Sequence, residues 1–500
     1  MNTQQSILKI KNNLPKYLLV AAIMYMPIFG HLTSLPFQIW DEARLANNAY
    51  EMFNNNNFIV TSYGNQPDMW NTKPPLMIWF QVFFMHLFGV NELAVRLPSA
   101  LAALFTCIGL LAFFEKTFKS FWFATITVAV LITTGGYIAL HVSRTGDYDA
   151  LLVFFTTIGG LSFFHFTETF NNRFLYYFFI ATTLSVLTKS VTGLLFLPAM
   201  FLYVIYRKQF VIILKNKHFY IGIAIFIFFV CGYYIIREIM NNGYLQAVQN
   251  NELGGRYLET NEGHGHEFWY YFHNIVDYQM KFWYLFIPAG LFIGIFSKNE
   301  KIKRLTIFSA LMVVVFFLVI SAAKTSLHWY TAPLFPFLAI LVAICLHFIF
   351  LFIQQNNFIN NQLTKNILPY LFLLFLIFTP YQTILNETIS PEKDNFYEMS
   401  TYLREALRGK HDVNNCKIIY KYNNQHLTIY TALLNKKNCN LSFADWTQLQ
   451  NGDKIVVSQK EMQDSIDSKY VYEVEQYYGN IRKMKILQNK NFQLDSTLIN

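Results

Sequence analysis

Long apolar runs, separated by short polar segments, make up most of the sequence up to residue 390. Runs of this length suit helices that cross the roughly 30 Å hydrocarbon core of a membrane, where each backbone polar group must be bonded within the helix. No small-residue cleavage site follows the first run, so we expect an anchor and not a cleaved signal peptide. We predict about eleven spans, over residues 14–33, 92–114, 121–141, 150–167, 173–188, 190–206, 218–236, 282–297, 305–322, 330–353 and 366–386.

Composition supports a polytopic membrane protein. Of the 500 residues, 54% are hydrophobic and only 14% are charged, which is too little charge to solvate a water-facing surface. The net charge of +9 comes from Lys and Arg residues that gather in short clusters between the apolar runs. This pattern reflects membrane topology, so we expect membrane lipids and no nucleic acid as partners.

The basic clusters fall on every second loop, and such clusters mark the cytoplasmic side of a membrane. We therefore predict a cytoplasmic N-terminus, with the loops 34–91 and 237–281 and the C-terminal part on the outer side. The clusters consist of Lys9, Lys11, Lys16, Lys116, Lys119, Arg173, Arg207, Lys208, Lys215, Lys217, Lys298, Lys301, Lys303 and Arg304.

Composition changes near residue 390, where charged residues and Asn become frequent. Short alternating runs at 416–422, 454–458 and 470–475 are typical of strands. We predict an all-α polytopic membrane domain over residues 1–389 and a small extracytoplasmic α/β domain over 390–500. Cys416 and Cys439 lie in the second domain, and their pairing stays open because it cannot be deduced from sequence.

The first outer loop carries Trp40-Asp41-Glu42-Ala43-Arg44 at the start of a predicted amphipathic helix. Adjacent residues of a helix point about 100° apart, so only one of Asp41 and Glu42 faces a given ligand. A carboxylate at a helix N-terminus is stabilised as an anion, which suits a general base or a cation ligand. The alternative is an interfacial helix with solvated charges, in which Asp41 pairs with Arg44.

Lys73 stands before Pro74 and Pro75 in the same loop. The prolines favour the first turn of a helix, and the free amides of that turn together with an ammonium group form a phosphate site. A lysine that extends towards lipid headgroups is the alternative.

Further charged residues mark the other outer loops. Arg144, Asp147 and Asp149 lie between two apolar runs, where charge is costly unless it pairs or acts. Lys189 and Lys324 stand at outer helix boundaries. Anchoring lysines usually form clusters on the inner side, so this arrangement favours function.

The long outer loop carries Arg256, His264 and His266 among aromatic residues. The two histidines reach one metal only if the loop curves, and a third ligand is not obvious. A polar interfacial loop with an aromatic belt is the alternative.

In their order and spacing, these motifs resemble the polytopic GT-C glycosyltransferases, which include the dolichyl-phosphate-mannose protein mannosyltransferases and the bacterial 4-amino-4-deoxy-L-arabinose lipid A transferases. The resemblance covers most of residues 10–350. It implies an inverting glycosyltransferase that moves a sugar from a polyprenyl-phosphate carrier to a lipid A, protein or glycan acceptor at the outer face of the bacterial inner membrane. It rests on Asp41-Glu42-Ala43-Arg44, Lys73-Pro74-Pro75, Arg144 to Asp149, Leu187-Thr188-Lys189 and Lys324-Thr325 with Trp329-Tyr330.

The resemblance also implies roles for single residues. Asp41 would be the catalytic carboxylate that orients or deprotonates the acceptor hydroxyl, with Asp149 or Asp147 completing the acceptor side. Lys73 would neutralise the departing phosphate. The candidate helpers at the phosphate are Lys189, Lys324, Arg256 and Arg144.

One motif departs from the family pattern. Some bacterial members carry a Glu just before the lysine motif, which holds a metal together with a loop His, whereas this chain has Thr72. We therefore expect no required cofactor, and Thr72 argues against a zinc-type metal. His266, with His264 nearby, would then contact substrate.

Two other functions stay open on sequence alone, a lipid or saccharide transporter and a polymerase or ligase that uses a diphosphate-linked chain. Transporters place ionisable groups near the bilayer midplane in related halves, but the middle spans here carry almost no charge and no repeat is visible. The sequence has no Walker loop or dinucleotide fingerprint, which argues against direct use of a nucleotide sugar.

Overall fold

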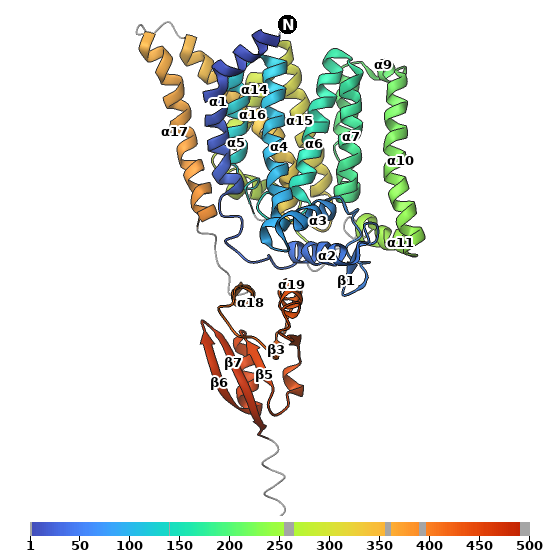
Figure 1. Cartoon of the computed structure of the whole chain (residues 1–500). Coiled ribbons are helices and arrows are strands. Elements are labelled where there is room, and N and C mark those ends of the chain that lie inside the picture. The colour runs from blue at the N-terminus through green and yellow to red at the C-terminus, as the bar shows by residue number, and fades with distance from the viewer. Residues whose placement is uncertain (1–2, 140, 255–264, 356–361, 390–396, 491–500) are drawn as a thin grey trace, which may run out of the picture. The chain divides into compact units, whose positions relative to one another are not determined.

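The computed structural model describes residues 3–139, 141–254, 265–355, 362–389 and 397–490 (Figure 1). The chain forms two compact units, one of residues 1–32 and 52–390 and the other of residues 33–51 and 391–500. The first unit is a helical bundle. The second contains a small sheet, and it includes the segment 33–51, which belongs to the predicted first outer loop.

Among the described residues of the first unit, the regular secondary structure is helical apart from a short hairpin of β1 (Ser62–Tyr63) and β2 (Gln66–Pro67). Its α-helices are α1 (Thr3–Phe29), α3 (Leu76–Phe88), α4 (Glu92–Phe118), α5 (Phe121–Ile132), α6 (Asp149–Thr169), α7 (Asn172–Lys189), α8 (Leu197–Tyr206), α9 (Phe210–Leu214), α10 (Lys217–Met240), α11 (Tyr244–Val248), α13 (Tyr270–His273), α14 (Phe286–Ile295), α15 (Glu300–Ser321), α16 (Phe335–Gln355) and α17 (Gln362–Ile389). The 3-10 helices are η1 (Ser190–Leu194) and η4 (His328–Leu334), and the π-helices are η2 (Gln249–Gly254) and η3 (Asn274–Gln279).

Each predicted span contains a helix, so the predicted fold class is confirmed. Among the described residues, seven helices are long and apolar enough to cross a membrane, and shorter apolar helices occupy the remaining predicted spans. The predicted span 121–141 is too long, because α5 ends at Ile132. There the hydroxyl groups of Thr133 and Thr134 donate back to helix carbonyls, and two helix-weakening glycines follow.

Burial separates central from peripheral helices in this unit. Most of the apolar window of α6 and α16 is buried, at 83% and 72%, whereas α10 and α17 are only 17% and 22% buried. These two helices lie at opposite edges of the unit (Figure 1) and expose large apolar side chains such as Phe228 and Phe375. Such surfaces suit contact with lipid, as in a multi-pass membrane protein.

Helices α14 and α16 make a close backbone contact at Gly290, where an added β-carbon would lie 1.8 Å from the carbonyl oxygen of Leu341. We expect Gly290→Ala to lower the free energy of unfolding by about 1–3 kcal/mol through overpacking. Thermal unfolding of the detergent-purified protein measures this change. Gly232→Ala on α10 is the matched control, because its β-carbon meets no described atom within 4 Å. Equal melting temperatures for the two variants would contradict the expectation.

The second unit has a five-stranded sheet in the order β4-β3-β5-β7-β6. Strand β3 is parallel to β4 and β5, whereas β7 is antiparallel to β5 and β6. The three predicted strands appear as β3, β5 and β6, so the predicted small α/β fold is confirmed. The strands are β3 (Cys416–Ile419), β4 (Ser442–Phe443), β5 (Lys454–Val457), β6 (Tyr470–Tyr478) and β7 (Ile481–Asn489), and the helices are α18 (Tyr397–Leu407), α19 (Gln425–Asn435), η5 (Trp446–Gln448) and α20 (Lys460–Lys469).

The segment 33–51 packs within this second unit. The backbone N–H of Phe37 donates to the Tyr430 hydroxyl at 3.0 Å, and the two rings are in contact. The side-chain amide of Asn47 donates to the carbonyl of Gln425 at 2.9 Å. Helix α2 (Asp41–Asn55), the predicted amphipathic helix, therefore starts in one unit and ends in the other. Cys416 and Cys439 are free thiols.

Candidate functional site

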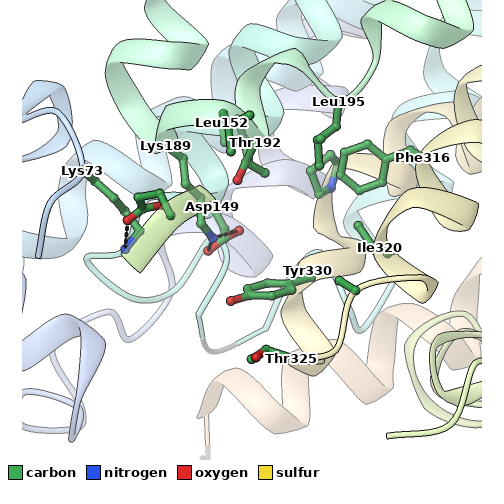
Figure 2. A pocket seen from close by; sticks show the side chains of 14 residues that line it. Lys73, Asp149, Leu152, Lys189, Thr192, Leu195, Phe316, Ile320, Thr325 and Tyr330 are labelled. Carbon is green, nitrogen blue, oxygen red and sulfur yellow. Dashed lines mark hydrogen bonds and ion pairs between the residues drawn. The ribbon is translucent and has the colours of Figure 1, made fainter. Parts of the chain in front are cut away.

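A cavity of about 50 Å³ lies in the helical unit, where α6 begins and α7 ends (Figure 2). Four charged side chains line it, from separate parts of the chain. Apolar side chains and two threonine hydroxyl groups complete the wall. The charged residues are Lys73, Asp149, Lys189 and Glu252, and the others include Leu152, Thr192, Leu195, Phe316, Ile320, Thr325 and Tyr330.

Lys189 and Asp149 form a buried ion pair, in which the Lys189 Nζ lies 2.7 Å from both carboxylate oxygens. Asp149 is the first residue of α6 and Lys189 is the last residue of α7. Each charge therefore sits at the helix end that stabilises it, an anion at an N-terminus and a cation at a C-terminus. The Lys189 ammonium also lies 5.3 Å from the centre of the Tyr330 ring, within range of a cation–π interaction.

Lys73 and Glu252 form a second, longer pair, with 3.6 Å between Lys73 Nζ and Glu252 Oε1. Both side chains are buried. The Thr72 hydroxyl donates to the same Glu252 oxygen at 3.2 Å, and the Tyr244 hydroxyl donates to the Thr72 carbonyl at 2.7 Å. These bonds hold the extended segment that leads into Pro74 and α3, so the Lys73 ammonium is kept inside the cavity.

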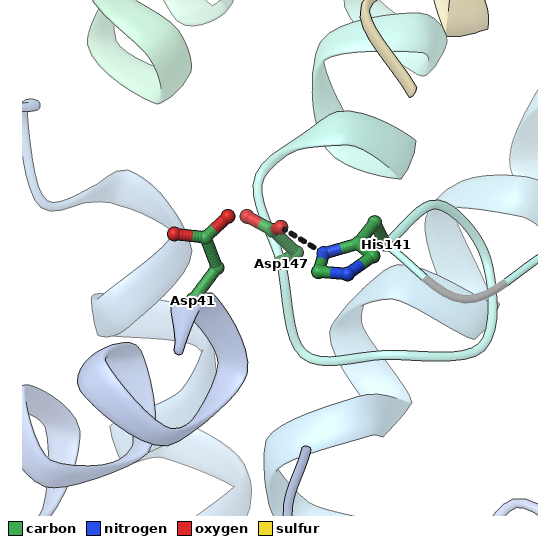
Figure 3. Close-up of side chains that lie close together, drawn as sticks. All are labelled: Asp41, His141 and Asp147. Atoms are coloured by element: carbon green, nitrogen blue, oxygen red, sulfur yellow. Dashed lines mark ion pairs between the residues drawn. The ribbon is translucent and has the colours of Figure 1, made fainter. Parts of the chain in front are cut away.

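Asp147 pairs with His141, with 3.5 Å between Asp147 Oδ2 and His141 Nδ1 (Figure 3). Burial would by itself raise the pKa of Asp147, but the neighbouring His141 ring and the positive charge of Lys189 hold it below its usual value. The backbone N–H of Tyr148 also donates to this carboxylate at 2.6 Å. Asp147 is thus an anion, and together with the His141 ring it offers donor atoms of the type that a divalent metal takes, although two ligands alone do not define a metal site. Figure 3 also draws Asp41, which belongs to the other unit.

The two acids of the first motif differ within the second unit. Asp41 is the first residue of α2 and is partly exposed, whereas Glu42 is 1% exposed. The Glu42 Oε2 accepts a hydrogen bond from the backbone N–H of Gln38 at 2.7 Å. Glu42 thus bonds to the chain that precedes α2, which leaves Asp41 as the more accessible carboxylate.

Other predicted site residues lie away from the cavity wall. The Arg144 guanidinium donates to the carbonyls of Pro27 and Gly30, so it holds the end of α1. Lys324 and His266 line a second, open recess together with Glu267, and the His266 ring stacks on Tyr270. The two hollows are neighbours, because Ala323 lines both of them. Arg256 and His264 lie outside the described residues.

Sequence reasoning did not single out Glu252. It belongs to a polar stretch of the outer loop 237–281, in which Glu262 and Glu267 carry the same side chain without any distinguishing motif. Tyr330 entered only as part of a family motif, because an aromatic residue near a membrane interface is common. Only the folded chain brings these two side chains to the lysines.

The structure of ArnT from Cupriavidus metallidurans bound to undecaprenyl phosphate is similar over nearly the whole chain. The similarity covers 94% of this chain and 98% of ArnT, with a TM-score of 0.70 and 13% sequence identity. The chain has the fold of the GT-C glycosyltransferases. Residues 72–235 of the chain also match the sequence profile of the family described as dolichyl-phosphate-mannose-protein mannosyltransferase. The matched region contains Lys73, Asp149 and Lys189.

Two sequence relatives of this chain are also identified. An uncharacterised protein of Aquifex aeolicus is 26% identical over 361 residues, which are 70% of this chain and 65% of the relative. A protein of Bacillus subtilis named as a putative mannosyltransferase, YycA, is 32% identical over 103 residues, 21% of this chain and 15% of the relative. The chain thus spans less than two thirds of each relative. The fold resemblance predicted from the motifs is confirmed, and the chain is a multi-pass membrane protein.

Proposed function

We propose that this protein is an inverting glycosyltransferase that moves a sugar from a polyprenyl-phosphate carrier to a hydroxyl group of a lipid, protein or glycan. The observation that carries the proposal is the cavity itself. It combines two buried lysines with apolar side chains from α6, η1 and α15. A phosphate bound to a long hydrocarbon chain needs both kinds of contact.

The donor phosphate would bind at Lys73. The Lys73 ammonium stands just before the first turn of α3, whose free amides favour an anion. Leu152, Leu195 and Phe316 offer apolar contacts for the first prenyl units. In support, the similar GT-C structure named above was determined with undecaprenyl phosphate bound to it.

In the proposed reaction, the acceptor oxygen attacks the anomeric carbon and the bond from that carbon to the phosphate oxygen breaks. Asp41 takes the proton of the acceptor hydroxyl, and the leaving phosphate keeps the bonding electrons. Lys73 balances the charge that develops on this phosphate. Asp149 would hold the Lys189 ammonium in place through their ion pair. Asp147, together with His141, would complete the acceptor side of the site.

The proposed location is the outer face of the bacterial inner membrane, with a cytoplasmic N-terminus. Support comes from the two ends of the helical unit. Helix α9, which basic residues flank, lies at the end opposite α3 and α11 (Figure 1). The charged cavity residues stand at helix ends, not in the middle of spans, which argues against the transporter alternative.

The experiment that tests the proposal is deletion of the gene, followed by mass spectrometry of lipid extracts. We expect a polyprenyl-phosphate sugar to accumulate, and the wild-type gene to clear it. The mass of this lipid identifies the sugar class. Accumulation of a diphosphate-linked saccharide would favour the polymerase alternative, and no change in either lipid class would contradict a lipid-linked donor.

Lys73→Ala is expected to lower kcat/KM for the lipid donor by roughly 100- to 1,000-fold, because a transition-state charge loses its counter-ion. Transfer kinetics with purified protein and extracted donor lipid measure this loss. Lys298→Ala is the matched control, since Lys298 is exposed in the loop before α15. Unchanged donor kinetics in folded Lys73→Ala protein would exclude a phosphate contact at Lys73.

A further inference from the structure

Glu252 differs from the other acid of the cavity in how it is held. Asp149 opens the long helix α6 and binds Lys189 at 2.7 Å through both oxygens. Glu252 lies in the short π-helix η2 and stands 3.6 Å from Lys73. Its hydrogen bond with the Thr72 hydroxyl is also long, at 3.2 Å. These two contacts of Glu252 are longer than the contacts between Asp149 and Lys189.

Among the described residues, two positive and two negative side chains line the cavity wall, and the buried anion Asp147 interacts with the charge of Lys189. Lys73 and Lys189 are positive, and Asp149 and Glu252 are negative. A polyprenyl-phosphate sugar is a phosphodiester and brings one more negative charge. An uncompensated charge is costly inside a protein. The excess of negative charge is smaller if one carboxylate leaves when the phosphate enters.

Glu252 also occupies the position that a phosphate needs. Its Oε1 faces the Lys73 ammonium in front of α3, and a phosphate oxygen would use the same ammonium. The cavity of about 50 Å³ has room for only a few water molecules. A donor phosphate at the Lys73 ammonium would therefore take the place that the Glu252 carboxylate occupies.

We propose that Glu252 is a displaceable counter-ion of Lys73, which the donor phosphate replaces and which returns to expel the lipid phosphate product. The inference rests on the proposed function and names a further residue for that reaction. Transfer converts the phosphodiester into a phosphomonoester, which carries up to two negative charges and binds an ammonium more strongly. Glu252 competes with this product for Lys73 and so speeds its release.

The test is direct binding of undecaprenyl phosphate to the purified full chain in detergent micelles. We expect Glu252→Gln to bind the lipid about tenfold more tightly than wild type, because the competing charge is gone. Glu252→Asp retains the charge and should stay close to wild type. In turnover assays, Glu252→Gln should lower both KM for the donor and kcat, since product release becomes slow.

A purely structural role of Glu252 predicts the opposite sign. If Glu252 only positions Thr72 and Lys73, then Glu252→Gln would bind the lipid more weakly, and this result would overturn the proposal. Unchanged binding would overturn it as well.

Thr72→Val keeps the inference testable if Glu252→Gln does not fold. This variant removes the hydroxyl that holds Glu252 but leaves every charge in place, and we expect severalfold tighter lipid binding. Weaker or equal binding would contradict the inference. If wild type and Lys73→Ala both fail to bind undecaprenyl phosphate, the proposed function fails first, so the two failures can be distinguished.

Discussion

Asp41→Asn is expected to abolish sugar transfer, with a loss of roughly 100- to 10,000-fold in turnover, because the acceptor hydroxyl loses its general base. The amide keeps the size of the side chain, so membrane abundance and melting temperature should match wild type. The measurement is clearance of the accumulated donor lipid in the deletion strain, together with turnover of the purified variant.

Two further variants sharpen this expectation. Asp464→Asn is the matched control, since Asp464 is an exposed acid on α20 of the same unit. Glu42→Gln is expected to act mainly on stability, because Glu42 is buried and bonded to the backbone N–H of Gln38. Full clearance of the lipid by Asp41→Asn would remove Asp41 from the chemistry.

Asp149→Asn is expected to lower the free energy of unfolding by about 3–5 kcal/mol, because it leaves the Lys189 ammonium buried without its carboxylate. Activity should fall with stability, since Lys189 lines the cavity. Thermal unfolding of the purified protein measures the first effect, and transfer kinetics measure the second.

The double variant Asp149→Asn/Lys189→Met separates stability from function. Removing both charges together should recover most of the stability, as it does for other buried pairs, but it should not restore transfer. Lys460→Ala provides the control, because its pair with Asp464 is exposed and contributes at most about 1 kcal/mol. A single variant at Asp149 or Lys189 with the melting temperature of wild type would contradict the expected contribution of this pair to stability.

Much of the candidate site follows from local sequence logic. A charge between two apolar runs stands out whatever the tertiary structure, so Lys73, Asp149 and Lys189 could be selected in advance. Their exact partners could not, because an ion pair depends on which helix ends meet. Arg144 shows the limit of this logic: it was selected for the same reason, yet its guanidinium binds the backbone carbonyls of Pro27 and Gly30.

The recess of Lys324 and His266 shows a second limit. Sequence placed both residues on the outer side together with Lys73, but one side of a membrane protein contains more than one hollow. The chain from Ser321 to Thr325 separates this recess from the cavity, so Thr325 lines one hollow and Lys324 lines the other. Residues one position apart in such a turn point in different directions, and hydropathy carries no information about that choice.

By itself the sequence determined the membrane-spanning helices, the C-terminal α/β fold and the family resemblance. These features depend on hydrophobic length, charge position and alternation, which are local properties of the chain. Only the tertiary structure decided that the segment 33–51 packs with the C-terminal unit and that Glu252 faces Lys73. Both are contacts between residues far apart in the chain, and they arise because buried polar groups must find partners wherever the packed helices bring them together.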